Sequence, residues 1–272
     1  MQLAISNIAW SAEDEAALLP QLQARGVRGI EVAPTKIQPS WDAITPESVR
    51  EYRTRLDDAG LHIPALQAIV FGRADLQFFD PQTHAAFGEH IRRVAGIAHQ
   101  LGAQVLVFGA PKNRKRGQIA FHEAWSMAVE FGGKLAEICQ AEGVVLGWEH
   151  NPVEYGCDFV TNHADARGLV DAIGSPGLQL HLDAAGLHLC GGDIARQIAE
   201  VGPFCHYHAS EPMLEPLTGD SVGQAQALRA VAATGCVEWV SIEMKTPEHR
   251  DSVFESIDLI RTALESVPAG SK

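Results

Sequence analysis

The chain has 272 residues, 46% of them hydrophobic, and a formal net charge of -13 at pH 7. This length is typical of one (β/α)8 barrel, and no Pro/Gly/Ser-rich linker or block of charge divides the chain, so we expect a single domain over residues 1–272. The acidic charge argues against nucleic-acid binding, which depends on cationic neutralisation of phosphates. The longest apolar stretches are too short to cross a bilayer, so no membrane partner is expected.

The first ten residues, MQLAISNIAW, lack the basic segment and the small-residue cleavage site of a signal peptide. The five cysteines are odd in number and show no CxxC spacing, which indicates neither a disulfide framework nor a thiolate metal site. We therefore expect a cytoplasmic protein with reduced thiols.

Strand-like and helix-like segments alternate along the whole chain. In the first half we expect strands at 4–10, around Glu31, from His62 and from Val105, and helices at 12–25, 46–59 and 81–101. In the second half we expect helices at 123–142, 164–173, 194–201, 223–233 and 252–266, between strands that reach Glu149, Asp183, His208 and Glu243.

Eight strand-helix units of this length predict an α/β fold, a closed (β/α)8 TIM barrel, because crossovers are right-handed and both faces of a parallel sheet must be covered. A doubly wound open sheet is the alternative. It would usually bring a glycine-rich phosphate loop after its first strand, and SNIAWSAEDE contains none.

Four short apolar runs in the second half each lead to a metal-capable side chain: Glu149 in VVLGWEH, Asp183 in LQLHLD, His208 in FCHYH and Glu243 in WVSIE. A carboxylate at the end of a strand buried on both faces is costly unless a charged or hydrogen-bonding partner meets it. In a barrel these strand ends share the C-terminal face, where functional side chains lie. Two Glu, one Asp and one His suit Mn²⁺, Mg²⁺, Co²⁺ or Zn²⁺.

Each position also has a structural interpretation. Glu149 could pair with a loop Arg or Lys, Asp183 could cap the Ala-Gly turn that follows it, and Glu243 could pair with Lys245. His206 and His208 alternate in the same strand and so share a face, and either could be a hydrogen-bonded core histidine. We prefer His208 as the ligand, because it lies nearer the strand end, and expect His206 to support it or to contact substrate. A basic loop, PKNRKRG at residues 111–117, is either exposed to solvent or contacts an anionic group of the substrate.

The stretches WEHNP, LDAAGLHLCGGD, HYHASEP and WVSIEMK resemble the strand-end motifs of the xylose isomerase-like TIM barrels, the sugar phosphate isomerase/epimerase superfamily of ketose 3-epimerases, hydroxypyruvate isomerases and inosose dehydratases. The resemblance implies one divalent ion bound by Glu149, Asp183, His208 and Glu243, with Mn²⁺ as the preferred candidate. It also implies that Glu149 and Glu243 act as the acid and the base toward a sugar substrate. A homo-oligomer and a monomer both stay open as the assembly state. Two positions depart from the epimerase pattern: Gly186 stands where a His is usual, and Glu154 is an approximate match to a second Glu.

We therefore expect an isomerase or epimerase of a ketose or keto-sugar, phosphorylated or not, that works through a cis-enediolate. Expected substrate contacts from the second half of the barrel are His188, His206, Glu211 and Lys245, and those from the opposite wall are Trp10 and Glu31. Elimination of water from the same enediolate, as in inosose or dehydroshikimate dehydratases, is the nearest alternative. An apurinic endonuclease would need a richer ligand cluster and a basic face, and a non-catalytic sugar-binding barrel would not need two opposed carboxylates.

Overall fold

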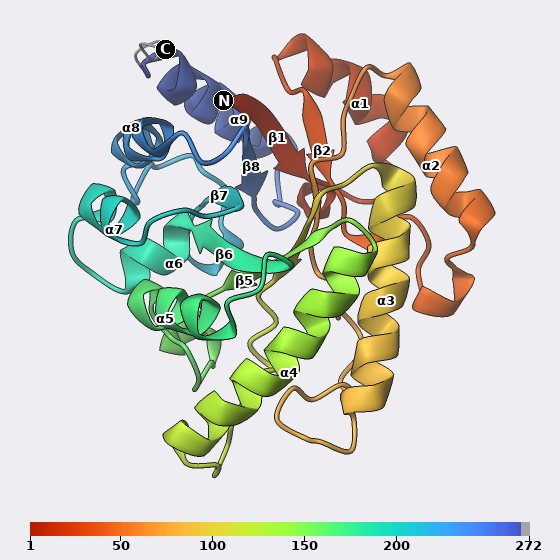
Figure 1. Ribbon diagram of the computed structural model, residues 1–272. Helices are drawn as coiled ribbons and strands as arrows, with labels where there is room; N and C mark the ends of the chain where they lie inside the picture. Colours follow the sequence, from red (N-terminus) through yellow and green to blue (C-terminus); the bar gives the residue numbers. More distant parts are fainter. Residues whose placement is uncertain (268–272) are drawn as a thin grey trace.

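The computed structural model describes residues 1–267, which contain an eight-stranded parallel sheet in the order β2-β1-β8-β7-β6-β5-β4-β3. Isolated bridges from Gly29 to His62 and from Val32 to Leu66 join the two end strands, so the sheet forms a nearly closed barrel with helices around it (Figure 1). The strands are β1 Gln2–Ser6, β2 Gly29–Glu31, β3 Ala65–Leu66, β4 Val105–Phe108, β5 Val145–Glu149, β6 Leu178–Asp183, β7 His206–Ser210 and β8 Trp239–Glu243. The (β/α)8 barrel predicted from the sequence is confirmed.

The helices begin and end close to the positions expected from the sequence. Thr45 and Ser48 form a reciprocal capping box at the start of α2, and Asn162 caps α5 through the backbone N–H of Asp165. Gly102 ends α3 in the left-handed region at φ 78°. The helices are α1 Glu15–Ala24, α2 Pro46–Asp58, α3 His84–Leu101, α4 Phe121–Ala141, α5 His163–Ile173, α6 Ala184–Leu189, α7 Ile194–Glu200, α8 Gln224–Thr234 and α9 Asp251–Glu265.

The third strand is much shorter than the run from His62 that we expected. Pro64 has no N–H to donate to a ladder, and Ala68 adopts a left-handed conformation with φ 53°, so regular pairing is confined to Ala65 and Leu66. Four backbone hydrogen bonds across the join still connect 28–32 with 62–67, among them Ile30 N to the carbonyl of His62 at 2.8 Å. The join between β2 and β3 is therefore the thinnest part of the barrel wall.

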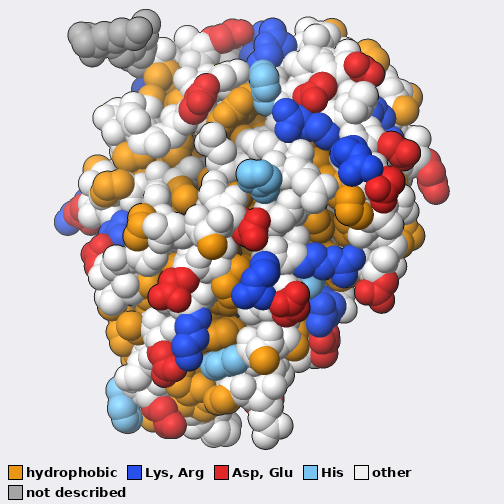
Figure 2. Space-filling view, turned by 45° about the vertical axis from the view of Figure 1, so that its right-hand side comes forward, with side chains coloured by type: hydrophobic (Ala, Val, Ile, Leu, Met, Phe, Trp, Pro, Cys, Tyr) orange, Lys and Arg blue, Asp and Glu red, His pale blue; other side chains and the backbone are white. Residues whose placement is uncertain are grey.

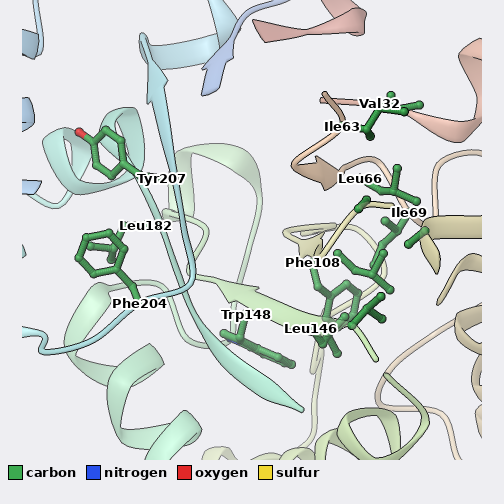
Figure 3. Close-up of a cluster of buried hydrophobic side chains, with 14 of the residues drawn as sticks. Val32, Ile63, Leu66, Ile69, Phe108, Leu146, Trp148, Leu182, Phe204 and Tyr207 are labelled. Carbon is green, nitrogen blue, oxygen red and sulfur yellow. The ribbon is translucent and has the colours of Figure 1, made fainter. Parts of the chain in front are cut away.

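Apolar side chains fill the space between the sheet and the surrounding helices (Figure 3). Phe108 and Trp148 pack edge to face there, with ring centroids 5.4 Å apart. Inside the barrel, Ala65, Val105 and Val107 form a small separate apolar cluster. Interior positions nearer the C-terminal ends of the strands are polar instead, which is unusual for a barrel core and identifies this end as the candidate site.

Within residues 1–267, none of the helices has both the length and the apolar composition needed to span a bilayer. The five cysteines are free. On the face of the molecule seen in Figure 2, acidic and basic side chains are interspersed with one another and with apolar ones.

Candidate metal centre

Three of the four side chains singled out in the sequence converge at the C-terminal ends of neighbouring strands. One ligand atom from each of Asp183, His208 and Glu243 lies within 4.8 Å of the other two. Nδ1 of His208 is 3.2 Å from Oε2 of Glu243 and 4.0 Å from Oδ2 of Asp183. The side chain of His208 is fully buried, whereas that of Glu243 is 15% exposed, so the cluster reaches the surface on the Glu243 side.

Glu149, at the end of β5, lies beside this cluster without belonging to its closest group. Burial, followed by the charges of Asp183 and Glu243, raises the pKa of Glu149 well above its ordinary value. Its Oε1 accepts a hydrogen bond from Nδ2 of Asn151 at 3.2 Å. The three carboxylates therefore face one another closely enough to repel.

Asp183 caps the turn that follows it, as the sequence allowed, and also takes part in the cluster. Its Oδ1 accepts a hydrogen bond from the backbone N–H of Gly186 at 2.6 Å and so caps α6, a helix that we did not expect. Its Oδ2 accepts from the hydroxyl of Ser210 and faces His208. Burial and the charge of Glu243 raise the pKa of Asp183 to about 6. Helix capping thus uses one oxygen and leaves the other in the cluster.

His208 is oriented from behind by Glu31, which lies at the end of β2. Nε2 of His208 donates to Oε1 of Glu31 at 2.8 Å, and Nε2 of His206 donates to Oε2 at 3.0 Å. Burial opposes ionisation of Glu31, but the two rings outweigh it and lower its pKa well below the ordinary value. Since Nε2 of His208 is used in this way, Nδ1 is the atom turned toward Asp183 and Glu243. His208 is also not the last residue of its strand, which continues to Ser210.

The donor set fits a divalent cation. Nδ1 of His208 is buried without a hydrogen bond to any described residue, although Glu243 lies 3.2 Å away. Burial disfavours a charged ring, but Glu31 and Glu243 raise the pKa of His208 well above its ordinary value, so this place attracts positive charge. Carboxylate oxygens and one imidazole nitrogen form the mixed ligand set of Mn²⁺, Mg²⁺, Co²⁺ and Zn²⁺ sites.

The expected substrate contacts lie in varied environments, and their role stays a prediction. His188 is exposed on α6, and Trp10 is buried at 3% exposure. Glu211 accepts hydrogen bonds from Ser221 and from the backbone N–H of Val222. Lys245 pairs with Glu215 at the surface. Both oxygens of Glu31 are used by the two histidines, so this residue supports His208 from behind instead of forming an open wall.

Sequence reasoning missed the residues that surround Glu149. A Cβ built on Gly109 would lie 2.4 Å from Oε2 of Glu149, and Asn151 holds the other oxygen. His150 turns its ring toward the empty side of Gly186, where a Cβ would meet its Nε2 at 3.0 Å. The glycine that departs from the epimerase pattern thus leaves room for the histidine that follows Glu149. The position of Gly109 directly after the β4 run was the available signal.

A sequence model of the xylose isomerase-like TIM barrel family matches residues 19–265, whereas a search of curated proteins found no match. Among solved structures, an L-ribulose 3-epimerase is 18% identical over 100% of both chains with a TM-score of 0.78. The apo 3-keto-D-glucoside 4-epimerase YcjR from E. coli is 14% identical, covers 96% of this chain and 99% of its own, and gives a TM-score of 0.78. The IolI protein with a bound zinc atom is 17% identical over 99% and 100% of the two chains, with a TM-score of 0.76.

At these identities the structural likeness establishes the fold, and the family match extends over most of the chain. The protein belongs to the xylose isomerase-like TIM barrel family.

Proposed function

We propose that the protein is a divalent-metal-dependent isomerase or epimerase of a ketose or keto-sugar. The observation that carries this proposal is the convergence of Asp183, His208 and Glu243 within 4.8 Å, with Glu149 beside them. Two solved structures of the same fold are named as sugar epimerases, and a third holds a zinc atom, which supports the same assignment.

Glu149, Asp183, His208 and Glu243 would hold the ion, with Mn²⁺ as the first candidate. When bound, a divalent cation supplies a Lewis acid that polarises a carbonyl group and makes the neighbouring C–H more acidic. The buried carboxylates also need such a counter-charge, because removing several anions from water without a cation is costly.

Glu149 and Glu243 would move the proton. One carboxylate removes the proton from the carbon next to the substrate carbonyl, which gives a cis-enediolate, and the other returns a proton. Return to the opposite face of the same carbon gives an epimer, and return to the adjacent carbon gives an aldose-ketose isomerisation. Burial and the neighbouring carboxylates raise the pKa of Glu149, and a bound cation would offset this by favouring the ionised form.

The first test is metal content by elemental analysis of protein purified without chelator. We expect about one divalent ion per chain in the wild type and its loss in Glu149→Gln and Asp183→Asn. Glu154→Gln, at an exposed position of the segment that follows β5, is the matched control and should keep the ion. Absence of bound metal after incubation with Mn²⁺, Co²⁺ or Zn²⁺ would overturn the ligand set.

The second test follows carbon-bound protons by NMR in deuterated water with a panel of ketoses. Exchange in the wild type that is lost in Glu149→Gln and in Glu243→Gln supports the proposal, and product analysis then separates epimer from isomer. A product that has lost one water would show a dehydratase instead. A metal-loaded protein that catalyses no exchange with any ketose of the panel would contradict sugar isomerisation.

A further inference from the structure

Arg114, from the basic loop 111–117, turns into the protein and is fully buried. Its guanidinium lies over Trp148 at 4.4 Å and over Phe108 at 5.1 Å from the ring centroids, and the two rings lie close together in Figure 3. The sequence predicted that this loop is either exposed to solvent or contacts an anion. Arg114 does neither, because it is buried against two aromatic rings. A buried cation is costly, so the contacts that it makes at this place need an explanation.

Arg114 donates both of its hydrogen bonds from one nitrogen to the strand end that carries Glu149. Nη2 contacts the main-chain carbonyl of Glu149 at 2.7 Å and Oδ1 of Asn151 at 2.6 Å. Nε and Nη1 have no hydrogen-bond partner among residues 1–267. The guanidinium is thus held by two aromatic faces and two acceptors, and both acceptors belong to the segment that ends β5.

The contact with Arg114 decides which way the amide of Asn151 points. A guanidinium has donors and no acceptor, so Asn151 must turn its oxygen toward Arg114 and its nitrogen away. That nitrogen, Nδ2, then donates to Oε1 of Glu149 at 3.2 Å. An amide turned the other way would place an oxygen against the carboxylate and an NH₂ group against the cation.

The opposite oxygen of the carboxylate is limited by Gly109. A Cβ at this position would lie 2.4 Å from Oε2 of Glu149 and 3.5 Å from Nδ2 of Asn151. No side chain larger than hydrogen fits there while Glu149 keeps its present rotamer. Asn151 therefore fixes one oxygen of Glu149, and the backbone at Gly109 bounds the other.

We propose that Arg114 and Asn151 are positioning residues that fix the orientation of the Glu149 carboxylate, with Gly109 leaving the space that this orientation needs. The inference deepens the proposed function, because the same carboxylate is assigned there as metal ligand and acid/base. Arg114 acts through Asn151, and neither residue is expected to contact the ion.

The test uses Asn151→Asp and Arg114→Lys. Aspartate keeps an oxygen toward Arg114 and so preserves the buried contact, but it turns a second oxygen toward Oε1 of Glu149 and repels it. Lysine keeps the positive charge but is shorter and lacks the flat guanidinium that lies over Trp148 and Phe108 and directs Nη2 toward both acceptors, so we expect Mn²⁺ affinity to fall in this variant as well. We expect melting temperatures close to wild type for Asn151→Asp and a dissociation constant for Mn²⁺, measured by calorimetry, that rises by about tenfold or more.

Lys112→Gln is the matched control, because it removes a charge from an exposed position of the same loop. Its Mn²⁺ affinity should stay within about twofold of wild type, since exposed charges contribute little. A loss of affinity in the control equal to that in Arg114→Lys would mean that the charge of the loop, and not the position of Arg114, acts on the site, and it would overturn the inference.

Crystal structures of the two variants give a readout that does not depend on metal binding. The inference expects the Glu149 carboxylate to be rotated away from its wild-type position in Asn151→Asp. An unchanged carboxylate and unchanged Mn²⁺ affinity in both variants would overturn it. If the wild-type protein binds no divalent ion, the proposed function fails, and the position of Glu149 in these crystals still decides the positioning role.

Discussion

Glu31 and His208 connect the second strand of the barrel to the seventh through a hydrogen bond of 2.8 Å between Oε1 and Nε2. The partners are separated by 177 residues and are both fully buried. A carboxylate that accepts from one ring nitrogen of a histidine fixes which nitrogen remains for a metal. Glu31 thereby determines that Nδ1 of His208 faces the candidate centre.

Glu31→Gln should weaken metal binding without removing a ligand. The amide can accept from one ring with its oxygen but must donate to the other with its nitrogen, so one of His206 and His208 has to move its proton to Nδ1. We expect Mn²⁺ affinity to fall about 10–100-fold in calorimetric titrations. Glu15→Gln is the control, because Glu15 is also buried but bonds Tyr52 and Arg55. Wild-type affinity in Glu31→Gln would show that Glu31 does not orient the ligand.

Asp183→Asn and Asp183→Ala should separate the two roles of Asp183. Both variants are expected to lose Mn²⁺ binding, since neither side chain carries a negative charge. Asparagine can still accept from the N–H of Gly186 and cap α6, whereas alanine cannot, so Asp183→Ala should be less stable than Asp183→Asn by about 1 kcal/mol. Urea unfolding of the metal-free proteins at pH 7 measures the difference. Equal stability of the two variants would show that the cap contributes nothing.

His90 should make the stability of the protein depend on pH. Its Nε2 bonds the carbonyl of Ile69 at 2.8 Å and its Nδ1 lies 3.0 Å from Nη1 of Arg73. Burial lowers the pKa of His90, and the neighbouring Arg73 and Arg93 lower it further. The unfolded chain therefore takes up this proton at a higher pH than the folded one, so the stabilisation present above the unfolded pKa is lost as pH falls toward the folded pKa.

The free energy of unfolding of wild type and His90→Gln, measured in urea from pH 7.5 to 5, should accordingly converge as the pH falls. His122→Gln, at an exposed position of α4, controls for the removal of a histidine. A difference between wild type and His90→Gln that stays constant over this range would contradict the proton linkage.

Replacing each of two glycines by alanine, one inside α4 and one packed against it, should change the stability of the protein in opposite directions. A Cβ at Gly133, inside α4, would meet nothing of the described chain within 4 Å apart from its chain neighbours and the backbone of its own helix, so Gly133→Ala should stabilise the protein by about 0.5–1 kcal/mol through helix propensity. At Gly177 a Cβ would lie 2.1 Å from the backbone oxygen of Ala136, so Gly177→Ala should destabilise by about 1–3 kcal/mol. Thermal and urea unfolding measure both, and a stable Gly177→Ala would show that the loop before β6 adapts.

The second half of the barrel was the more predictable half because its strands are five or six residues long and each carries a metal-capable side chain at or near its C-terminal end. The first half was harder. Pro64 and the left-handed Ala68 interrupt a segment whose composition is typical of a strand. The helix α6 was missed because its six residues, AAGLHL, carry too little periodicity, and its cap is the same Asp183 that we assigned to the metal.

The supporting contacts of the site could not be predicted in the same way. Glu31 had the same signal as the candidate ligands, a carboxylate at the end of an apolar run, but its pairing with His206 and His208 depends on the closure of the barrel. Arg114 lies in a segment whose composition is typical of exposed loops. Only the packing of Phe108 against Trp148 provides the aromatic surface that receives its guanidinium.

The thin join between β2 and β3 lies on the far side of the ring from β6 and β7, which carry Asp183 and His208. Because isolated bridges replace a continuous ladder there, amide protons at the join should exchange with solvent faster than those of β5 to β8. Glu31 is the site residue that sits on this join. Breathing of the barrel wall would therefore reach the candidate centre through the hydrogen bond to His208, while the strands that carry the ligands keep their register.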